Sequence, residues 1–226
     1  MIILLVNDDG FNSKRLELTK NILSKFGSVY VVVPMKEQSG KSMAITLGDV
    51  SFTKHNDFMY SVNGTPVDCI SFAIFGLKIN PDFVVSGINE GFNIGIDTFY
   101  SGTVGAAFQA QYYGYKAVAF SGDSSGDRNI LRYFESTIDF VLENNMLSDK
   151  YILNINFPKE KFNHDSQVVM TEPFFVKMKL EVDVFEGKFI SRRRVLDTYL
   201  PTNTDVYALR NGAISISKLY LTRKNN

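Results

Sequence analysis

Residues 2–10 read Ile2-Ile3-Leu4-Leu5-Val6-Asn7-Asp8-Asp9-Gly10, an apolar run followed at once by an amide, two carboxylates and a glycine. A short continuous apolar run is typical of a strand buried on both faces of a parallel sheet. Carboxylates directly after such a strand lie at its carboxyl end, where ligands bind in open parallel sheets. This stretch therefore predicts a central strand, and it predicts which edge of the sheet carries the functional site.

Strands and helices alternate along the chain after this first strand. Further strands are expected at 28–34, 82–86, 116–121 and 151–157, with a hairpin or a pair of edge strands within 49–62. Apolar residues at helical spacing predict helices at 13–26, 65–77, 103–113 and 129–143, the first capped by Ser13 and the second by Thr65 before Pro66. Such alternation implies right-handed crossovers and an α/β fold with a doubly wound, mostly parallel, Rossmann-like sheet.

The pattern changes after Pro158. A hairpin is expected with its turn at Glu186-Gly187, and residues 213–221 alternate like another strand. We therefore predict a core over residues 1–159 and a C-terminal, β-rich appendage over residues 160–226, which embraces the sheet or a partner subunit.

The composition limits the partners and the compartment. Lys plus Arg and Asp plus Glu both number 24, so no net field favours nucleic acid as the main partner or an anionic membrane. Cys69 is the only cysteine, which excludes an internal disulfide and fits a reducing compartment. The apolar start is too short for a signal peptide, and no stretch approaches the ~20 apolar residues that span a bilayer. We expect a cytoplasmic location.

The carboxylate pair Asp8 and Asp9 carries most of the chemical information. Adjacent carboxylates at a buried strand end are costly unless a positive charge neutralises them, and a cation does so directly. Alternatively, one of the two caps the next helix or a turn. After the second strand, the hydroxyl of Ser39 could complete an oxygen shell, although a solvated loop residue is the plainer reading.

A glycine-containing loop over residues 86–95 leads to a helix that begins near Ser101-Gly102-Thr103. Exposed amides at a helix N-terminus, with these hydroxyls, can bind a phosphate, but N-capping uses the same geometry. Asn89 and Asn93 in the loop could be ligands or could satisfy backbone groups. The oxygen donors in these loops suit Mg²⁺, Mn²⁺ or Ca²⁺ and argue against zinc or copper. A metal beside an anion site favours phosphoryl chemistry.

Five segments, in this order, resemble the SurE family of survival proteins, which act as nucleoside monophosphate phosphatases. They are residues 3–10, Val33-Pro34 with Gln38-Ser39-Gly40, residues 63–69, residues 81–89 with Ser86-Gly87-Ile88-Asn89, and residues 100–104 with Ser101-Gly102-Thr103-Val104. Weaker similarity continues at 153–158, 204–205 and 212–216, so the resemblance spans nearly the whole chain.

The resemblance implies a divalent-metal-dependent 5'-nucleotidase, which could also act on 3'-nucleotides. It implies one divalent cation per subunit, Mg²⁺ or Mn²⁺, held by Asp8, Asp9, Ser39 and Asn89. It also implies that Asn93, Ser101, Gly102 and Thr103 surround the substrate phosphate, that Asp8 or Asp9 acts as general base, and that a homodimer or homotetramer forms through exchanged C-terminal segments. The chain departs from the family after Gly10, where Asn12-Ser13-Lys14-Arg15 replaces an Ala-Pro-Gly-like run.

Two other functions compete with this interpretation. Gly122-Asp123-Ser124-Ser125-Gly126 formally matches the nucleophile elbow of a serine hydrolase, which would need His55 or His164 as its base. A nucleotide sensor without catalysis could use the same sheet, although a dinucleotide-binding glycine fingerprint is absent after the first strand.

Overall fold

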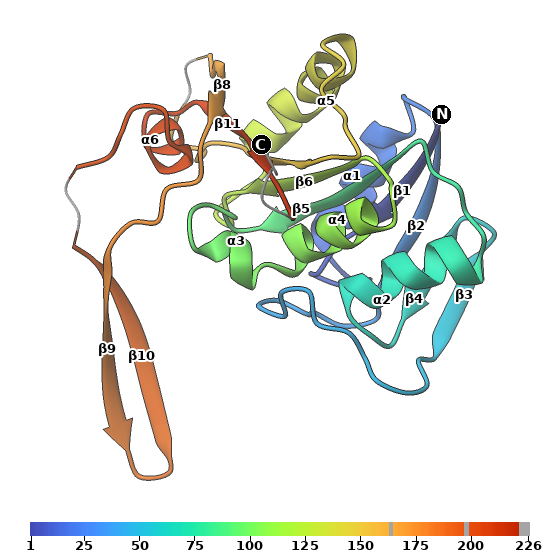
Figure 1. The fold of residues 1–226 in the computed structure, drawn as a ribbon, viewed down its shortest axis with the longest axis horizontal. Helices are drawn as coiled ribbons and strands as arrows, with labels where there is room; N and C mark the ends of the chain where they lie inside the picture. Colours follow the sequence, from blue (N-terminus) through green and yellow to red (C-terminus); the bar gives the residue numbers. More distant parts are fainter. Residues whose placement is uncertain (163–164, 197–198, 222–226) are drawn as a thin grey trace.

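The computed structural model describes residues 1–162, 165–196 and 199–221. Its centre is a nine-stranded sheet with the order β3, β4, β2, β1, β5, β6, β7, β11, β8 (Figure 1). The strands are β1 Ile2–Val6, β2 Ser28–Pro34, β3 Phe52–Asn56, β4 Met59–Val62, β5 Phe83–Glu90, β6 Ala117–Gly122, β7 Ile152–Asn156, β8 Val168–Thr171 and β11 Ile214–Leu219. Only β3 with β4 and β7 with β11 pair antiparallel within this sheet. The predicted mostly parallel α/β sheet is confirmed.

Strand β1 lies between β2 and β5 and pairs in parallel with both. Its side chains alternate between two apolar cores: Ile3 and Leu5 join one cluster, and Leu4 and Val6 join the other. All four are fully buried. The apolar run is continuous because both faces of the strand are covered, and the prediction of a central strand is confirmed.

Helices cover both faces of the sheet (Figure 1). Their bounds are α1 Lys14–Leu23, α2 Pro66–Ser71 continued by the π-helix Phe72–Gly76, α3 Asp97–Tyr100, α4 Gly102–Tyr112, α5 Arg128–Glu143 and α6 Asp205–Arg210. Helices α1 and α5 pack over the cluster of Ile3, and α2 and α4 over the cluster of Leu4. The predicted caps, Ser13 and Thr65, are both confirmed. Within the described residues, no helix is long and apolar enough to cross a membrane.

Strand β5 is longer than the sequence predicts. The expected strand ends at Ser86 with an irregular loop after it, whereas β5 continues to Glu90. Its pairing with β6 is interrupted by a bulge between Ser86 and Asn89, and the pairing resumes at Asn89. A β-carbon at Gly87 would lie 2.3 Å from the carbonyl oxygen of Phe120, and only glycine permits this approach. The bulge places Asn89 on the sheet rather than in a loop.

The C-terminal residues contribute to two structures. Strands β8 and β11 complete the main sheet, whereas β9 Met178–Phe185 and β10 Lys188–Val195 form a separate two-stranded arm with the predicted turn at Glu186-Gly187. Figure 1 shows this arm extending away from the rest of the chain. The short elements β8 and α6 are not apparent from sequence periodicity. The division of the chain after residue 159 remains a prediction.

Candidate metal and phosphate site

The carboxyl ends of β2, β1 and β5 lie next to one another because these strands are neighbours in the sheet. Asp8 and Asp9 follow β1, Ser39 lies in the loop after β2, and Asn89 lies near the end of β5. A cleft of about 570 Å³ at this edge is lined by Asp9, Ser39 and Glu90, among others. The fold therefore brings together residues as far apart in the sequence as Asp8 and Asn89.

Asp8 is 2% exposed and lies against the N-terminus of α4. The hydroxyl of Thr103 donates a hydrogen bond to its Oδ1 at 2.5 Å, and the backbone of Gly102 packs closely against the same side chain. Burial raises the pKa of Asp8 above its ordinary value, and the hydrogen bond from Thr103 and the nearby backbone of α4 oppose the rise. The N-terminus of α4 therefore binds an anion, and in this structure that anion is the carboxylate of Asp8.

Asp9, beside it, is partly exposed to the cleft, but its Oδ2 is buried and has no hydrogen-bond partner within the described residues. Burial, followed by the charges of Asp8 and Glu90, raises the pKa of Asp9 to about 7. A buried carboxylate oxygen without a partner, close to two further carboxylates, is costly unless a cation neutralises it. The residues present therefore fit a divalent cation.

The other two predicted metal ligands offer neutral oxygens. Ser39 is exposed, and its hydroxyl donates to Oε1 of Glu37 at 2.8 Å. The side-chain nitrogen of Asn89 donates to the carbonyl oxygen of Gly91 at 2.9 Å. A metal would use the amide oxygen of Asn89, which this hydrogen bond does not occupy.

Three of the predicted phosphate ligands have structural partners: Thr103, whose hydroxyl donates to Asp8, and also Ser101 and Asn93. The hydroxyl of Ser101 accepts a hydrogen bond from the amide of Val104 at 3.0 Å, which is an N-cap of α4. The side-chain nitrogen of Asn93 donates to the hydroxyl of Ser121 at 2.8 Å, and the backbone amide of Asn93 donates to Asn156 at 2.9 Å. Capping therefore accounts for Ser101 in this structure, and its contact with phosphate stays a prediction, as does that of Asn93.

Comparison with known proteins bears on this arrangement directly. The family model described as survival protein SurE matches residues 3–178. The chain belongs to the SurE family. A curated relative named 5'/3'-nucleotidase SurE, from Wigglesworthia glossinidia brevipalpis, is 35% identical over 240 residues and covers 100% of this chain and 94% of the relative. The 5'-nucleotidase SurE of Legionella pneumophila is 34% identical over 232 residues, covering 98% and 91%.

A solved structure supports the same family membership. The crystal structure of the SurE protein from Aquifex aeolicus superposes with a TM-score of 0.83 at 28% identity, and the match covers 100% of this chain and 95% of that one. The C-terminal residues are included in this match, so the SurE-like fold with its β-rich C-terminal part is confirmed.

Two residues near the SurE-like carboxylates were assigned no role from the sequence. Glu90 adds a third negative charge beside Asp9, and its place directly after Asn89 was the available signal. Arg15, in the first turn of α1, is buried. Only the tertiary contacts of Arg15 reveal its role, because an arginine in the first turn of a helix is ordinarily solvated.

The serine-hydrolase alternative lacks geometric support. Ser124 lines the cleft, but the ring of His55 stacks on Phe11 and its Nε2 lies 2.9 Å from the hydroxyl of Ser61. The hydroxyl of Ser125 donates to Asp123 at 2.5 Å. The other candidate base, His164, lies outside the described residues. Neither described serine of this loop forms a hydrogen bond with a described histidine, as the nucleophile of a triad would.

The oxygen ligands of the candidate site also favour a hard cation such as Mg²⁺ or Mn²⁺. Within residues 1–162, 165–196 and 199–221, no group of three or more His, Cys, Asp or Glu side chains is arranged to hold a metal. A zinc centre usually needs such a group, whereas Mg²⁺ and Mn²⁺ are often bound by one or two carboxylates together with neutral oxygens and water. The carboxylates Asp8 and Asp9 with a hydroxyl and an amide match the second pattern.

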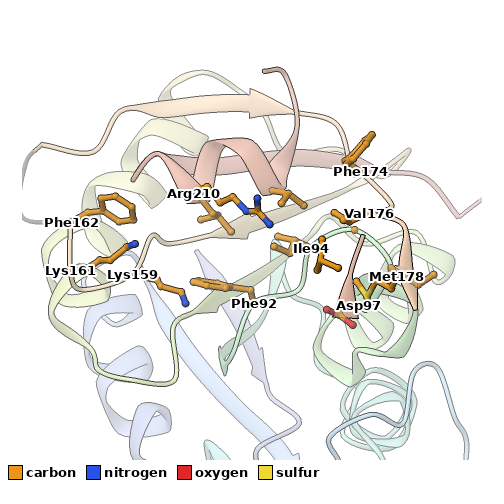
Figure 2. A pocket seen from close by; sticks show the side chains of 15 residues that line it. Phe92, Ile94, Asp97, Lys159, Lys161, Phe162, Phe174, Val176, Met178 and Arg210 are labelled. Carbon is orange, nitrogen blue, oxygen red and sulfur yellow. The ribbon is translucent and has the colours of Figure 1, made fainter. Parts of the chain in front are cut away.

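A separate hollow of about 310 Å³ lies beside the loop between β5 and α3 (Figure 2). Its walls are mainly apolar, including Phe92 and Ile94 of this loop, and the guanidinium of Arg210 points into it from α6. None of the four predicted metal ligands lines this hollow. The candidate metal site is therefore the cleft beside Asp9, where the oxygen donors lie, and not this apolar hollow.

Proposed function

We propose that this chain is a divalent-metal-dependent phosphatase that hydrolyses nucleoside monophosphates to nucleoside and phosphate. The observation that carries the proposal is the buried Oδ2 of Asp9, beside Asp8 at the carboxyl end of β1, which has no hydrogen-bond partner in the part of the chain that the structure describes. The names of the relatives from Wigglesworthia and Legionella, 5'/3'-nucleotidase and 5'-nucleotidase, support the same substrate class.

In this proposal Asp8, Asp9, Ser39 and Asn89 hold one Mg²⁺ or Mn²⁺ per subunit. Such a cation, when bound, polarises the phosphoryl oxygens and promotes ionisation of the attacking water. The carboxylate of Asp8 is held in place by the hydroxyl of Thr103 and by close packing against Gly102, which fixes the direction of this ligand. Asp9 lines the cleft whereas Asp8 is buried, so Asp9 is the better placed of the two to accept a proton from water.

The substrate phosphate is proposed to bind near the N-terminus of α4, surrounded by Asn93, Ser101, Gly102 and Thr103. Amides at a helix N-terminus attract anions, and charge neutralisation by the cation offsets the repulsion from the aspartates. The network around Asn93 supports a fixed loop there, because the side chains of Asn154 and Asn156 both donate to the carbonyl oxygen of Asn93.

Metal-dependent phosphate release tests the proposed function. We expect turnover of 5'-nucleoside monophosphates, and of 3'-esters if the site accepts both, in the presence of Mn²⁺ or Mg²⁺ and none in EDTA. A serine-directed phosphonate should leave the rate unchanged. Inactivation by the phosphonate would instead support the serine hydrolase, and nucleotide binding without turnover under any metal would support a nucleotide sensor.

We also propose that the chain forms a homodimer or homotetramer through exchanged C-terminal segments. In the arm, Leu180, Val182, Val184 and Phe189 share one face, which also carries Ser191 and Arg193. The opposite face carries Lys179, Glu181, Asp183 and Arg192 together with Phe185 and Ile190. The four apolar side chains of the first face are all exposed. An isolated two-stranded hairpin is marginally stable in water, and covering this apolar face by a second copy would stabilise it.

Val182 and Ile190 provide a matched test, because both are 48% exposed but they lie on opposite faces of the arm. Val182→Asp is expected to lower the molar mass seen by light scattering to that of a smaller assembly, since it places a charge in the apolar face. Ile190→Asp should leave the mass unchanged. Equal behaviour of the two variants would contradict assembly through this face.

A cytoplasmic location is part of the proposal. Cys69 is the only cysteine of the sequence and is buried in α2 as a free thiol. Burial raises the pKa of this thiol well above its ordinary value, so it remains protonated and unreactive. The fold therefore does not depend on oxidation, in keeping with a reducing compartment.

A further inference from the structure

Arg15, in the first turn of α1, is only 3% exposed, and its guanidinium lies at the carboxyl ends of β5 and β6. All three of its nitrogens donate hydrogen bonds. The acceptors are the carbonyl oxygens of Asn89 at 2.6 Å, Gly122 at 3.3 Å, Asp123 at 2.5 Å and Gly126 at 3.3 Å, and the carboxylate of Asp127 at 2.7 Å.

This arrangement is more than a buried ion pair. Among the described residues, the one carboxylate that bonds directly to this buried guanidinium is that of Asp127, whose side chain is 41% exposed. The positive charge of Arg15 also opposes the rise in the pKa of Asp9. The remaining compensation comes from four backbone carbonyl oxygens, which the planar, five-donor fork of arginine can bind together. A lysine ammonium has a compact charge with three donors and cannot span the same set.

Two of these carbonyl oxygens belong to residues next to the candidate cleft, since Asn89 precedes Glu90 and Asp123 precedes Ser124, and both Glu90 and Ser124 line it. Asn89 is a proposed ligand, and its backbone is held directly by the shortest of the Nη1 contacts of Arg15. The loop over residues 123–127 is held by the Nη2 and Nε contacts, and Ser124 of this loop lines the same cleft as Asp9. One side chain therefore joins α1, the end of β5 and the loop after β6.

We propose that Arg15 is a positioning residue for the cation site, holding the backbone of Asn89 and the loop over residues 123–127 so that the ligand oxygens converge. The proposal rests on the proposed function, since it takes Asn89 as a metal ligand. Groups that orient metal ligands typically contribute 10–100-fold in metal affinity.

The test measures Mn²⁺ binding by calorimetry with the full-length chain, well below its unfolding temperature. Arg15→Ala is expected to weaken Mn²⁺ binding by about 10–100-fold. Guanidinium ion at roughly 20 mM, far below denaturing concentrations, should restore part of that affinity by occupying the vacated position. Restoration by an added ion is not expected if the substitution merely lowers stability.

Arg128→Ala is the matched control. Arg128 also begins a helix and donates to a backbone carbonyl oxygen, that of Glu160, but it is exposed and does not line the cleft. The Arg128→Ala variant should bind Mn²⁺ with the same affinity as the wild type. Asp127→Asn removes only the ion pair, and it should retain most of the affinity if the carbonyl contacts dominate.

The outcomes separate this proposal from the proposed function. Wild-type affinity in folded Arg15→Ala overturns the positioning role and leaves the nucleotidase intact, whereas a wild type that binds no Mn²⁺ overturns the metal site itself. If Arg15→Ala does not fold, Arg15→Lys keeps the charge and decides the question. Weakened Mn²⁺ binding in Arg15→Lys supports a positioning role for the carbonyl contacts. Wild-type affinity in Arg15→Lys overturns that role.

Discussion

Replacing Asp9 with asparagine is expected to lower kcat/KM for a nucleoside monophosphate in Mn²⁺ by about 1,000-fold or more. A metal ion contributes several kcal/mol of charge stabilisation in the transition state, and each 1.36 kcal/mol corresponds to a tenfold rate. The neutral amide would remove one of the two charges that hold the cation and the group best placed to accept a proton. Phosphate release measured over a range of metal concentrations checks this result.

The same substitution should stabilise the metal-free protein at high pH. Burial and the charges of Asp8 and Glu90 raise the pKa of Asp9 from 3.8 to about 7, so the folded state binds more protons than the unfolded state between these values. The contribution of Asp9 to stability therefore falls as pH rises from about 4 to 7 and stays unfavourable above that range. In EDTA at pH 8, Asp9→Asn should unfold at a higher temperature than the wild type, with the difference vanishing near pH 4.

Saturating Mn²⁺ should reverse this order, because a ligand that binds only the folded state raises the melting temperature. The wild type should gain stability from Mn²⁺, and Asp9→Asn should gain little. Asp123→Asn, which changes a carboxylate just after β6, two strands away from β1, is the matched control and should behave as wild type. Full activity of Asp9→Asn would rule out the proposed site, as would wild-type stabilisation of that variant by Mn²⁺.

Gly102→Ala is expected to lower activity by about 100-fold while the protein stays folded, an effect of the size seen when one preorganised donor is lost. The new β-carbon would lie 2.9 Å from both Cβ and Oδ2 of Asp8, so the carboxylate must leave the end of α4. Alanine itself favours a helix over glycine by about 1 kcal/mol, which limits the loss of stability. The measurements are kcat/KM in Mn²⁺ and the melting temperature in EDTA.

Gly114→Ala controls for a generic effect of alanine near the same helix. Gly114 follows the C-terminal end of α4, and a β-carbon there would meet nothing within 4 Å, although its φ of +87° makes alanine mildly strained. It should lose some stability and no activity, which is the opposite of Gly102→Ala. Unchanged activity in Gly102→Ala would show that the contact between Asp8 and α4 is not needed for turnover.

Local patterns were sufficient to predict much of the fold. The apolar run of β1 needs no partner to be recognised, because burial on both faces leaves a continuous stretch of Ile, Leu and Val. Ser13 and Thr65 cap their helices through hydrogen bonds to residues two and three positions away, and such contacts are visible in sequence. The short elements β8 and α6 span too few residues for a hydrophobic period to be recognised.

The chemistry of the site was only partly visible in the same way. The pair Asp8 and Asp9 at a strand end indicated a cation because two adjacent carboxylates cannot both be buried cheaply. The role of the helix at Ser101-Gly102-Thr103 could not be decided, since capping and phosphate binding require the same amides and hydroxyls. The structure shows that Ser101 caps this helix. It also shows that Thr103, in the first turn of the same helix, donates a hydrogen bond to Asp8.

The sequence by itself determined that a parallel sheet would end in two carboxylates, and its motifs placed the chain among the SurE proteins. Only the tertiary structure decided that Thr103 donates to Asp8 across ninety-five residues, and that Arg15 reaches carbonyl oxygens seventy-four to one hundred and eleven residues away. The physical reason is how far apart in the sequence the interacting residues lie. Strands and caps follow from neighbours along the chain, whereas the protonation of Asp9 and the surroundings of Arg15 depend on charges and burial supplied by distant segments.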